Sequence, residues 1–163
     1  MRAWTDTPQT QPTAVGARVL RFPSLRAPRG DQEGSAGTDS SRPGPLRHAS
    51  VLLVEDDYIV AFDMQMLIEE QGATVLGPAA SIEEALRLLD ASAPAVAVLD
   101  VNLNGDLVFP LTEALQSRGI PYLFATAYAD DERLFPAHAK SAPRLAKPVL
   151  PNVLIAQLEK LLS

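Results

Sequence analysis

The stretch of residues 95–102 constrains the fold of this chain more than any other. Five small or branched apolar residues, 95–99, lead directly into Asp100, and the pair Asn104-Gly105 follows in a loop. An uninterrupted apolar run of this kind indicates a strand buried on both faces, as at the centre of a parallel sheet. Open α/β sheets bind ligands just beyond the carboxyl ends of their strands, where Asp100 lies. A lone aspartate here also commonly ends a strand or caps a helix, so the other strand ends must decide.

From residue 50 onward, short apolar runs alternate with segments of helical periodicity. The expected strands are 51–54, 74–76, 95–102, 121–125 and 145–146. The expected helices are 58–71, 81–89, 107–118, 130–140 and 151–162. Ser81 and Glu84 match a capping box, Gly72 is placed to end the first helix, and Pro136 interrupts the fourth. Five strand–helix units predict an α/β fold with a doubly wound, five-stranded parallel sheet and right-handed crossovers.

Charge and composition divide the chain near residue 50. Residues 1–49 carry seven Arg and four acidic residues and are rich in Pro, Gly and Ser, which predicts a disordered tail. Residues 50–163 carry seven Lys or Arg and sixteen acidic residues, which argues against nucleic acid as a direct ligand. The chain has no Cys and no apolar run of membrane-spanning length. We therefore expect one cytoplasmic domain, at residues 50–163, with no membrane partner.

Polar side chains follow four of the five expected strands. In chain order they are Glu55, Asp56, Asp57, Asp100, Thr126 and Lys147. Taken singly, an acidic run is commonly a solvated loop, a Thr after a strand a turn residue, and a Lys before Pro a surface residue. As a set they are chemically consistent, because clustered carboxylates repel one another unless a cation lies among them.

A hard divalent cation suits such a cluster, and Mg²⁺ characteristically binds a few carboxylates together with water and phosphate oxygens. A carboxylate nucleophile beside Mg²⁺ can accept a phosphoryl group and form an acyl phosphate. The charge on the transferred group is then met by the metal, an ammonium and a hydroxyl or backbone N–H. Lys147 and Thr126 have the side chains required for the last two roles.

Residues 50–163 resemble the receiver domain of bacterial two-component response regulators. The motifs that carry the resemblance are Val54-Glu55-Asp56-Asp57, Val98-Leu99-Asp100, Ala125-Thr126-Ala127 and Ala146-Lys147-Pro148. Each motif is weak alone, whereas the four in this order are specific. The resemblance implies a flavodoxin-like sheet with strand order 2-1-3-4-5.

The resemblance also implies a metal site and a phosphorylation site. Asp100 would be the phosphoacceptor and, with Asp56, a direct Mg²⁺ ligand. Glu55 would contribute through a water molecule, and the backbone carbonyl of Asn102 would complete the protein ligands. Asp57 lies one place past the acidic pair and is expected to cap the first helix instead.

The same resemblance assigns the remaining motif residues to the phosphoryl group. Thr126 would bind a phosphoryl oxygen, and Lys147 would pair with both the phosphate and the carboxylate. The Lys147–Pro148 peptide bond is cis in many relatives, which would help to aim the ammonium.

Two departures from the family pattern concern the output switch. Receivers usually carry Tyr or Phe three residues before the Lys of the fifth strand, where this chain has Arg144. Residues 124–128 read Phe-Ala-Thr-Ala-Tyr and resemble a subgroup of stand-alone receivers with a Phe-Ala-Thr-Gly-Tyr signature, some linked to general stress signalling. That subgroup also lacks the usual aromatic. Thr126 and Tyr128 are therefore the candidate switch residues, with a simple surface aromatic as the alternative for Tyr128.

The favoured function is a receiver that takes a phosphoryl group from a sensor histidine kinase or phosphotransfer protein and signals through a downstream protein. Beyond its own phosphorylation and dephosphorylation we expect no enzymatic activity. A haloacid-dehalogenase-like aspartyl phosphatase would need a second Asp as general acid where this chain has Asn102, which transfers no protons at neutral pH. A degenerate receiver acting only as an interaction module is the third alternative, and the presence of every site residue argues against it.

Overall fold

The structure, a computed structural model, describes residues 44–163. The disorder predicted for residues 1–43 lies outside the described residues. In chain order the elements are β1 (Ser50–Val54), α1 (Tyr58–Glu70), β2 (Thr74–Ala79), α2 (Ile82–Ala91), β3 (Val96–Leu99), β4 (Asn102–Leu103), β5 (Asp106–Leu107), α3 (Phe109–Ser117), β6 (Tyr122–Thr126), the 3₁₀ turn η1 (Ala137–Ala139), β7 (Arg144–Ala146) and α4 (Pro151–Leu162).

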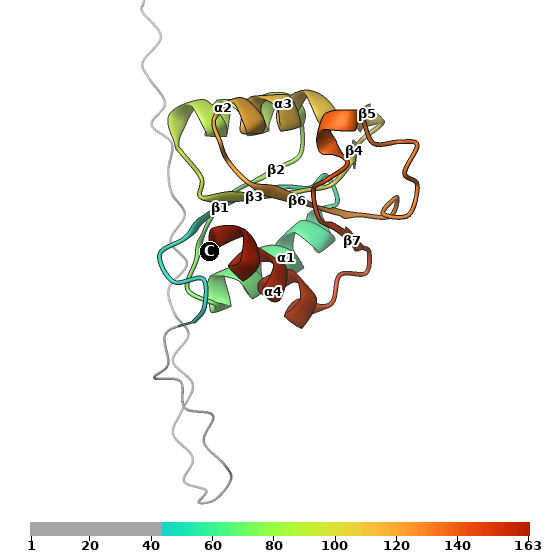
Figure 1. Cartoon of the computed structure of the whole chain (residues 1–163). Helices are drawn as coiled ribbons and strands as arrows, with labels where there is room; N and C mark the ends of the chain where they lie inside the picture. Colours follow the sequence, from blue (N-terminus) through green and yellow to red (C-terminus); the bar gives the residue numbers. More distant parts are fainter. Residues whose placement is uncertain (1–43) are drawn as a thin grey trace, which may run out of the picture. The chain divides into compact units, whose positions relative to one another are not determined.

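Five parallel strands form one sheet in the order β2-β1-β3-β6-β7. Counting only these five strands, the order is 2-1-3-4-5, so the predicted doubly wound, flavodoxin-like sheet is confirmed. Helices α1 and α4 cover one face of the sheet, and α2 and α3 cover the other (Figure 1). All five carboxyl ends therefore meet at one edge of the sheet.

The central strand β3 is apolar throughout because both of its faces are covered. Val96 and Val98 pack in the cluster that includes side chains of α1 and α4. Ala97 and Leu99 pack in the cluster that includes side chains of α2 and α3. All four residues are at most 1% exposed, so alternation between apolar and polar residues is absent from this strand.

The first two helices begin as their capping residues predict. Asp57 Oδ1 accepts hydrogen bonds from the backbone N–H groups of Ile59, at 2.9 Å, and Val60, at 3.2 Å, which confirms Asp57 as the N-cap of α1. Ser81 Oγ accepts from the N–H of Glu84 at 3.2 Å. The Glu84 carboxylate accepts from the N–H of Ala80, one residue before the partner expected in a capping box.

Two predicted helices differ from the structure. The segment 130–140 forms no α-helix, and only the 3₁₀ turn η1 lies within it. Pro136 offers no backbone N–H and disfavours helical geometry at the residue before it, so a helix cannot run through this segment. The helix predicted over 107–118 begins only at Phe109, because the preceding residues form the antiparallel β4–β5 hairpin.

Residues 44–49, which composition assigned to the tail, pack against the end of α1. Leu46 is buried, and its N–H donates to the carbonyl of Gln71 at 3.2 Å. The N–H of His48 donates to the carbonyl of Gly72, also at 3.2 Å. This short segment therefore packs with the domain. Within residues 44–163, no helix combines the length and apolar character needed to cross a bilayer.

Candidate functional site

The acidic residues lie together because β1 and β3 are neighbours in parallel register. Val54 pairs with Leu99, so the residues that follow them, Glu55 and Asp100, leave the sheet side by side. The N–H of Asp100 donates to the carbonyl of Val54 at 2.9 Å, which extends the pairing to the strand ends. Register alone thus brings two carboxylates together from positions 45 residues apart in the chain.

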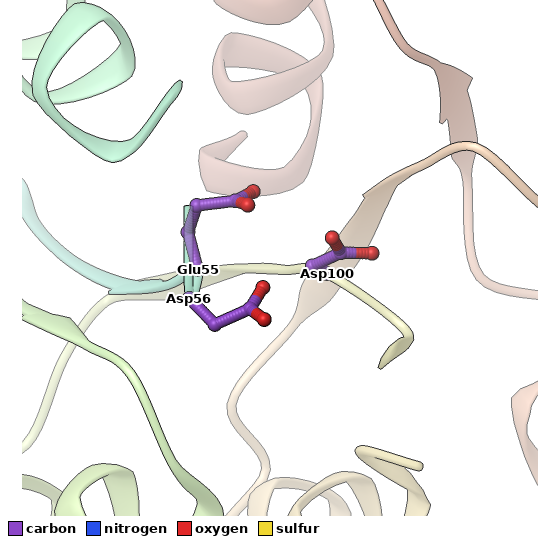
Figure 2. Close-up of side chains that lie close together, drawn as sticks. All are labelled: Glu55, Asp56 and Asp100. Atoms are coloured by element: carbon purple, nitrogen blue, oxygen red, sulfur yellow. The ribbon is translucent and has the colours of Figure 1, made fainter. Parts of the chain in front are cut away.

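Glu55, Asp56 and Asp100 form one carboxylate cluster. One oxygen from each lies within 4.8 Å of the others. Figure 2 shows Glu55 and Asp56 extending toward the side on which Asp100 lies. Glu55 is 3% exposed and Asp100 9% exposed, whereas Asp56 is half-buried. Asp56 is thus the most solvent-accessible of the three carboxylates, and the other two are largely removed from solvent.

Lys147, which follows β7, brings a positive charge into this cluster. Its Nζ lies 2.6 Å from Oε2 of Glu55 and 2.6 Å from Oδ2 of Asp100. Burial raises the pKa of Glu55, and the nearby ammonium of Lys147 only partly offsets that effect. Burial alone would lower the pKa of Lys147, but its hydrogen bonds to Asp100 and Glu55 outweigh this and raise it. Lys147 is therefore held in its charged form.

Each oxygen of the Asp100 carboxylate has a partner. Oδ1 accepts from the N–H of Val101 at 2.6 Å and, more weakly, from the N–H of Asn102 at 3.4 Å. Oδ2 accepts from Lys147 Nζ. Charge-assisted hydrogen bonds of this kind fix the direction of a carboxylate and stabilise negative charge at its oxygens.

Thr126 and Lys147 are adjacent across the last two strands of the sheet. Thr126 is fully buried at the end of β6, and its carbonyl accepts from the N–H of Lys147 at 3.1 Å. The Thr126 hydroxyl oxygen accepts from the N–H of Tyr128 at 3.3 Å. Tyr128 itself is 44% exposed, so its ring lies at the surface beside the strand ends. The Lys147–Pro148 peptide bond is cis.

Arg144 lies in β7 with its charged group satisfied by the segment that precedes it. Its guanidinium carbon is 4.1 Å from the centre of the Phe135 ring, within the range of a cation–π contact. Its Nη2 donates to the carbonyl of Lys140 at 3.0 Å. Arg144 therefore holds the non-helical connection between β6 and β7 against the sheet.

The oxygen donors of the carboxylate cluster fit a hard divalent cation. The three side-chain donors within 4.8 Å of one another are all carboxylates, the ligand class that Mg²⁺ prefers. Three carboxylates face a single ammonium, so a divalent ion would balance the remaining negative charge.

The sequence pattern of the response regulator receiver domain matches residues 51–159, about two thirds of the chain. The chain belongs to this family. Its receiver includes every site residue discussed above, from Glu55 to Lys147.

Solved structures and curated proteins similar to this receiver include several named regulators. SdrG from Sphingomonas melonis Fr1 is 31% identical, with a TM-score of 0.62, over 71% of this chain and 98% of that one. PhyR from Brucella abortus is 25% identical, with a TM-score of 0.62, over 72% of this chain and 50% of that one. The transcriptional regulatory protein PdtaR of Mycobacterium tuberculosis is 27% identical over 77% of this chain, which spans 61% of PdtaR.

The structure also shows a contact that the sequence analysis missed. The N–H of Asn104 donates to Oδ2 of Asp56 at 2.9 Å, across 48 positions of sequence. Asn-Gly is a strong signal for a two-residue hairpin turn, and Asn104-Gly105 occupies the turn of the β4–β5 hairpin. The sequence pattern places this pair only in a loop and predicts neither the hairpin nor its contact with Asp56.

Replacing Lys147 with Met is expected to lower the free energy of unfolding at neutral pH by about 3 kcal/mol, because Glu55 and Asp100 lose their cation. The pKa of Glu55, already raised by burial, should rise further, so the folded variant takes up protons as the pH falls. The destabilisation should therefore shrink in mildly acidic buffer. Chemical denaturation across a pH series measures this, with the exposed Lys140→Met as control. An equal loss at every pH would contradict it.

Asp56 and Asp57 are neighbours with different expected roles, so they form a matched pair. Asp56→Asn removes a carboxylate from the cluster and is expected to weaken Mg²⁺ binding by about tenfold or more. Asp57→Ala should cost about 1 kcal/mol of stability through the lost cap and leave Mg²⁺ binding unchanged. Calorimetric Mg²⁺ titration combined with chemical denaturation separates the two effects. Equal losses of Mg²⁺ affinity in the two variants would show that the metal-ligand and helix-cap roles of Asp56 and Asp57 are wrongly assigned.

Proposed function

We propose that this chain is a phosphoacceptor of a two-component system or phosphorelay. Asp100 accepts a phosphoryl group from a phosphohistidine of a sensor kinase or phosphotransfer protein, and the phosphorylated receiver signals through contact with a downstream protein. The observation that carries the proposal is the position of Lys147, whose ammonium lies 2.6 Å from both Glu55 and Asp100 at the carboxyl edge of a receiver-family sheet.

In the proposed reaction, an Asp100 oxygen attacks phosphorus while the bond from phosphorus to the donor imidazole breaks. Lys147 pairs with the negative charge on the carboxylate and on the incoming phosphoryl group. The buried Thr126 hydroxyl donates a hydrogen bond to a phosphoryl oxygen. Asp56, Asp100 and the backbone carbonyl of Asn102 would hold Mg²⁺, with Glu55 acting through water. When bound, the ion would supply positive charge to the phosphoryl oxygens.

Asn102 favours a signalling receiver over an aspartyl phosphatase. A haloacid-dehalogenase-like phosphatase needs a proton-transferring carboxyl group at the position of Asn102. The Asn102 side chain instead accepts from the N–H of Gly105 at 2.7 Å and serves the hairpin. One solved PhyR structure, 25% identical over 71% of this chain, is described as a stress response regulator, which supports stress signalling as the setting.

The direct test is phosphorylation of the purified full chain by a panel of autophosphorylated sensor kinases from its own genome, in the presence of Mg²⁺. We expect a mass gain of one phosphoryl group, lost on treatment with hydroxylamine as an acyl phosphate requires. Asp100→Asn or EDTA should abolish the gain, whereas the exposed Asp106→Asn should leave it intact. Acid-stable label that persists in Asp100→Asn would contradict the proposal.

We further propose that the signal leaves through Thr126 and Tyr128. The Thr126 hydroxyl accepts the N–H of Tyr128, so a hydroxyl drawn toward a phosphoryl group would release this contact and shift the loop. Arg144 stays on Phe135 and the Lys140 carbonyl, because a guanidinium separated from these contacts would lose its partners inside the structure. A coupling free energy of a few kcal/mol between phosphorylation and the loop conformation is sufficient to change which conformation is mainly populated.

Tyr128→Ala is accordingly expected to leave phosphoryl uptake by Asp100 nearly intact while removing the phosphorylation dependence of partner binding. Arg144→Ala should have the smaller effect on that dependence. The measurement compares the affinity of a partner, captured with phosphorylated wild-type protein, for phosphorylated and unphosphorylated forms of each variant. Loss of the dependence in Arg144→Ala but not in Tyr128→Ala would reject this route.

A further inference from the structure

The β4–β5 hairpin begins two residues after Asp100. Asn102 pairs with Leu107, and Leu103 pairs with Asp106, which leaves Asn104 and Gly105 as the two turn residues. Their φ angles are 54° and 102°, the positive values that a tight two-residue hairpin turn requires at both positions. The turn is closed further by the hydrogen bond from the N–H of Gly105 to Oδ1 of Asn102.

This hairpin is anchored to the core on both sides of the turn. Leu103, the residue before the turn, is 2% exposed and packs in the cluster that includes side chains of α2 and α3. Val108, directly after β5, is buried in the same cluster, and its N–H donates to the carbonyl of Val101 at 2.9 Å. The turn therefore has a fixed position relative to the strand ends.

The anchored turn directs one N–H at the carboxylate cluster. The N–H of Asn104 donates to Oδ2 of Asp56 at 2.9 Å, and one such bond leaves the second carboxylate oxygen available to a metal ion. The same hairpin contains Asn102, whose backbone carbonyl is an expected ligand, in its first strand. One expected Mg²⁺ ligand, Asp56, thus accepts a hydrogen bond from the turn, and a second, the Asn102 carbonyl, lies in the strand that leads into it.

We propose that Asn104 and Gly105 are positioning residues for the metal site: their positive-φ turn aims the Asn104 N–H at Asp56 and fixes the direction of its carboxylate. This inference rests on the proposed function, since it concerns the same Mg²⁺ site. Partners that orient a metal ligand typically change metal affinity by about 10- to 100-fold when they are lost. Mg²⁺ affinity then depends on the backbone conformation of residues that do not bind the ion.

Glycine positions allow a test through backbone conformation alone. A Cβ at Gly105 would meet no atom within 4 Å, so Gly105→Val acts through its φ of 102° and not through a clash. Gly119 also has a positive φ, 68°, and open space around a Cβ, but it follows α3, away from the cluster. Gly119→Val is therefore the matched control for strain.

Asn104 supplies the second pair of variants. Asn104→Gly keeps both the N–H and the ability to adopt a φ of 54°, so it should preserve the turn. Asn104→Val keeps the N–H but is strained at positive φ, so it should turn the N–H away from Asp56. If residue 104 served only to stabilise the fold, the folded forms of Asn104→Gly and Asn104→Val would bind Mg²⁺ with equal affinity.

Mg²⁺ alone is titrated into the full-length wild type and each variant by calorimetry, after circular dichroism confirms that the variant is folded. We expect Gly105→Val and Asn104→Val to bind Mg²⁺ about tenfold more weakly, and Asn104→Gly and Gly119→Val to bind like the wild type. Equal affinity in all five proteins would overturn the positioning role but not the metal site. Tighter binding by Gly105→Val would overturn it too, by showing that the N–H competes with the ion. A wild type that binds no Mg²⁺ would overturn both.

Discussion

The candidate site at the carboxyl edge of the sheet depends on the two ion pairs that Lys147 forms with Glu55 and Asp100. Two largely buried carboxylates at neighbouring strand ends would repel each other and destabilise the fold without a cation between them. One ammonium offsets only part of the charge of the three clustered carboxylates. The fold therefore holds its carboxylate cluster together while keeping an attraction for a divalent cation, as the proposed Mg²⁺ site requires.

Much of this architecture could be predicted because its signals are local. The apolar run ending at Asp100 identified the central strand, and the strand ends supplied the carboxylates, the hydroxyl and the lysine that the sheet order then places along one edge. Asp57 was correctly separated from the acidic pair as a helix cap, since a cap lies directly before its helix. Spacing of this kind needs no knowledge of contacts between distant segments.

Most of the features that the sequence did not predict depend on such distant contacts. Pro136, a local signal, excludes the helix expected at 130–140, whereas the contacts by which Arg144 holds this connection, with the Phe135 ring and the Lys140 carbonyl, were not predicted. The contact of Asn104 with Asp56 requires the hairpin and β1 to be placed next to each other first. Leu46 packs into the core although its surroundings have the composition of a tail, because a single buried side chain leaves little compositional trace.

Asp100 is the one carboxylate of this cluster that we propose to form an acyl phosphate. Borohydride reduces an aspartyl phosphate to homoserine, so reduction of the phosphorylated protein followed by peptide mass spectrometry identifies the modified residue directly. We expect conversion at position 100 alone, with Glu55, Asp56 and Asp57 unchanged. Conversion at one of those three acidic residues, or a phosphoryl group retained on a hydroxyl after reduction, would contradict it.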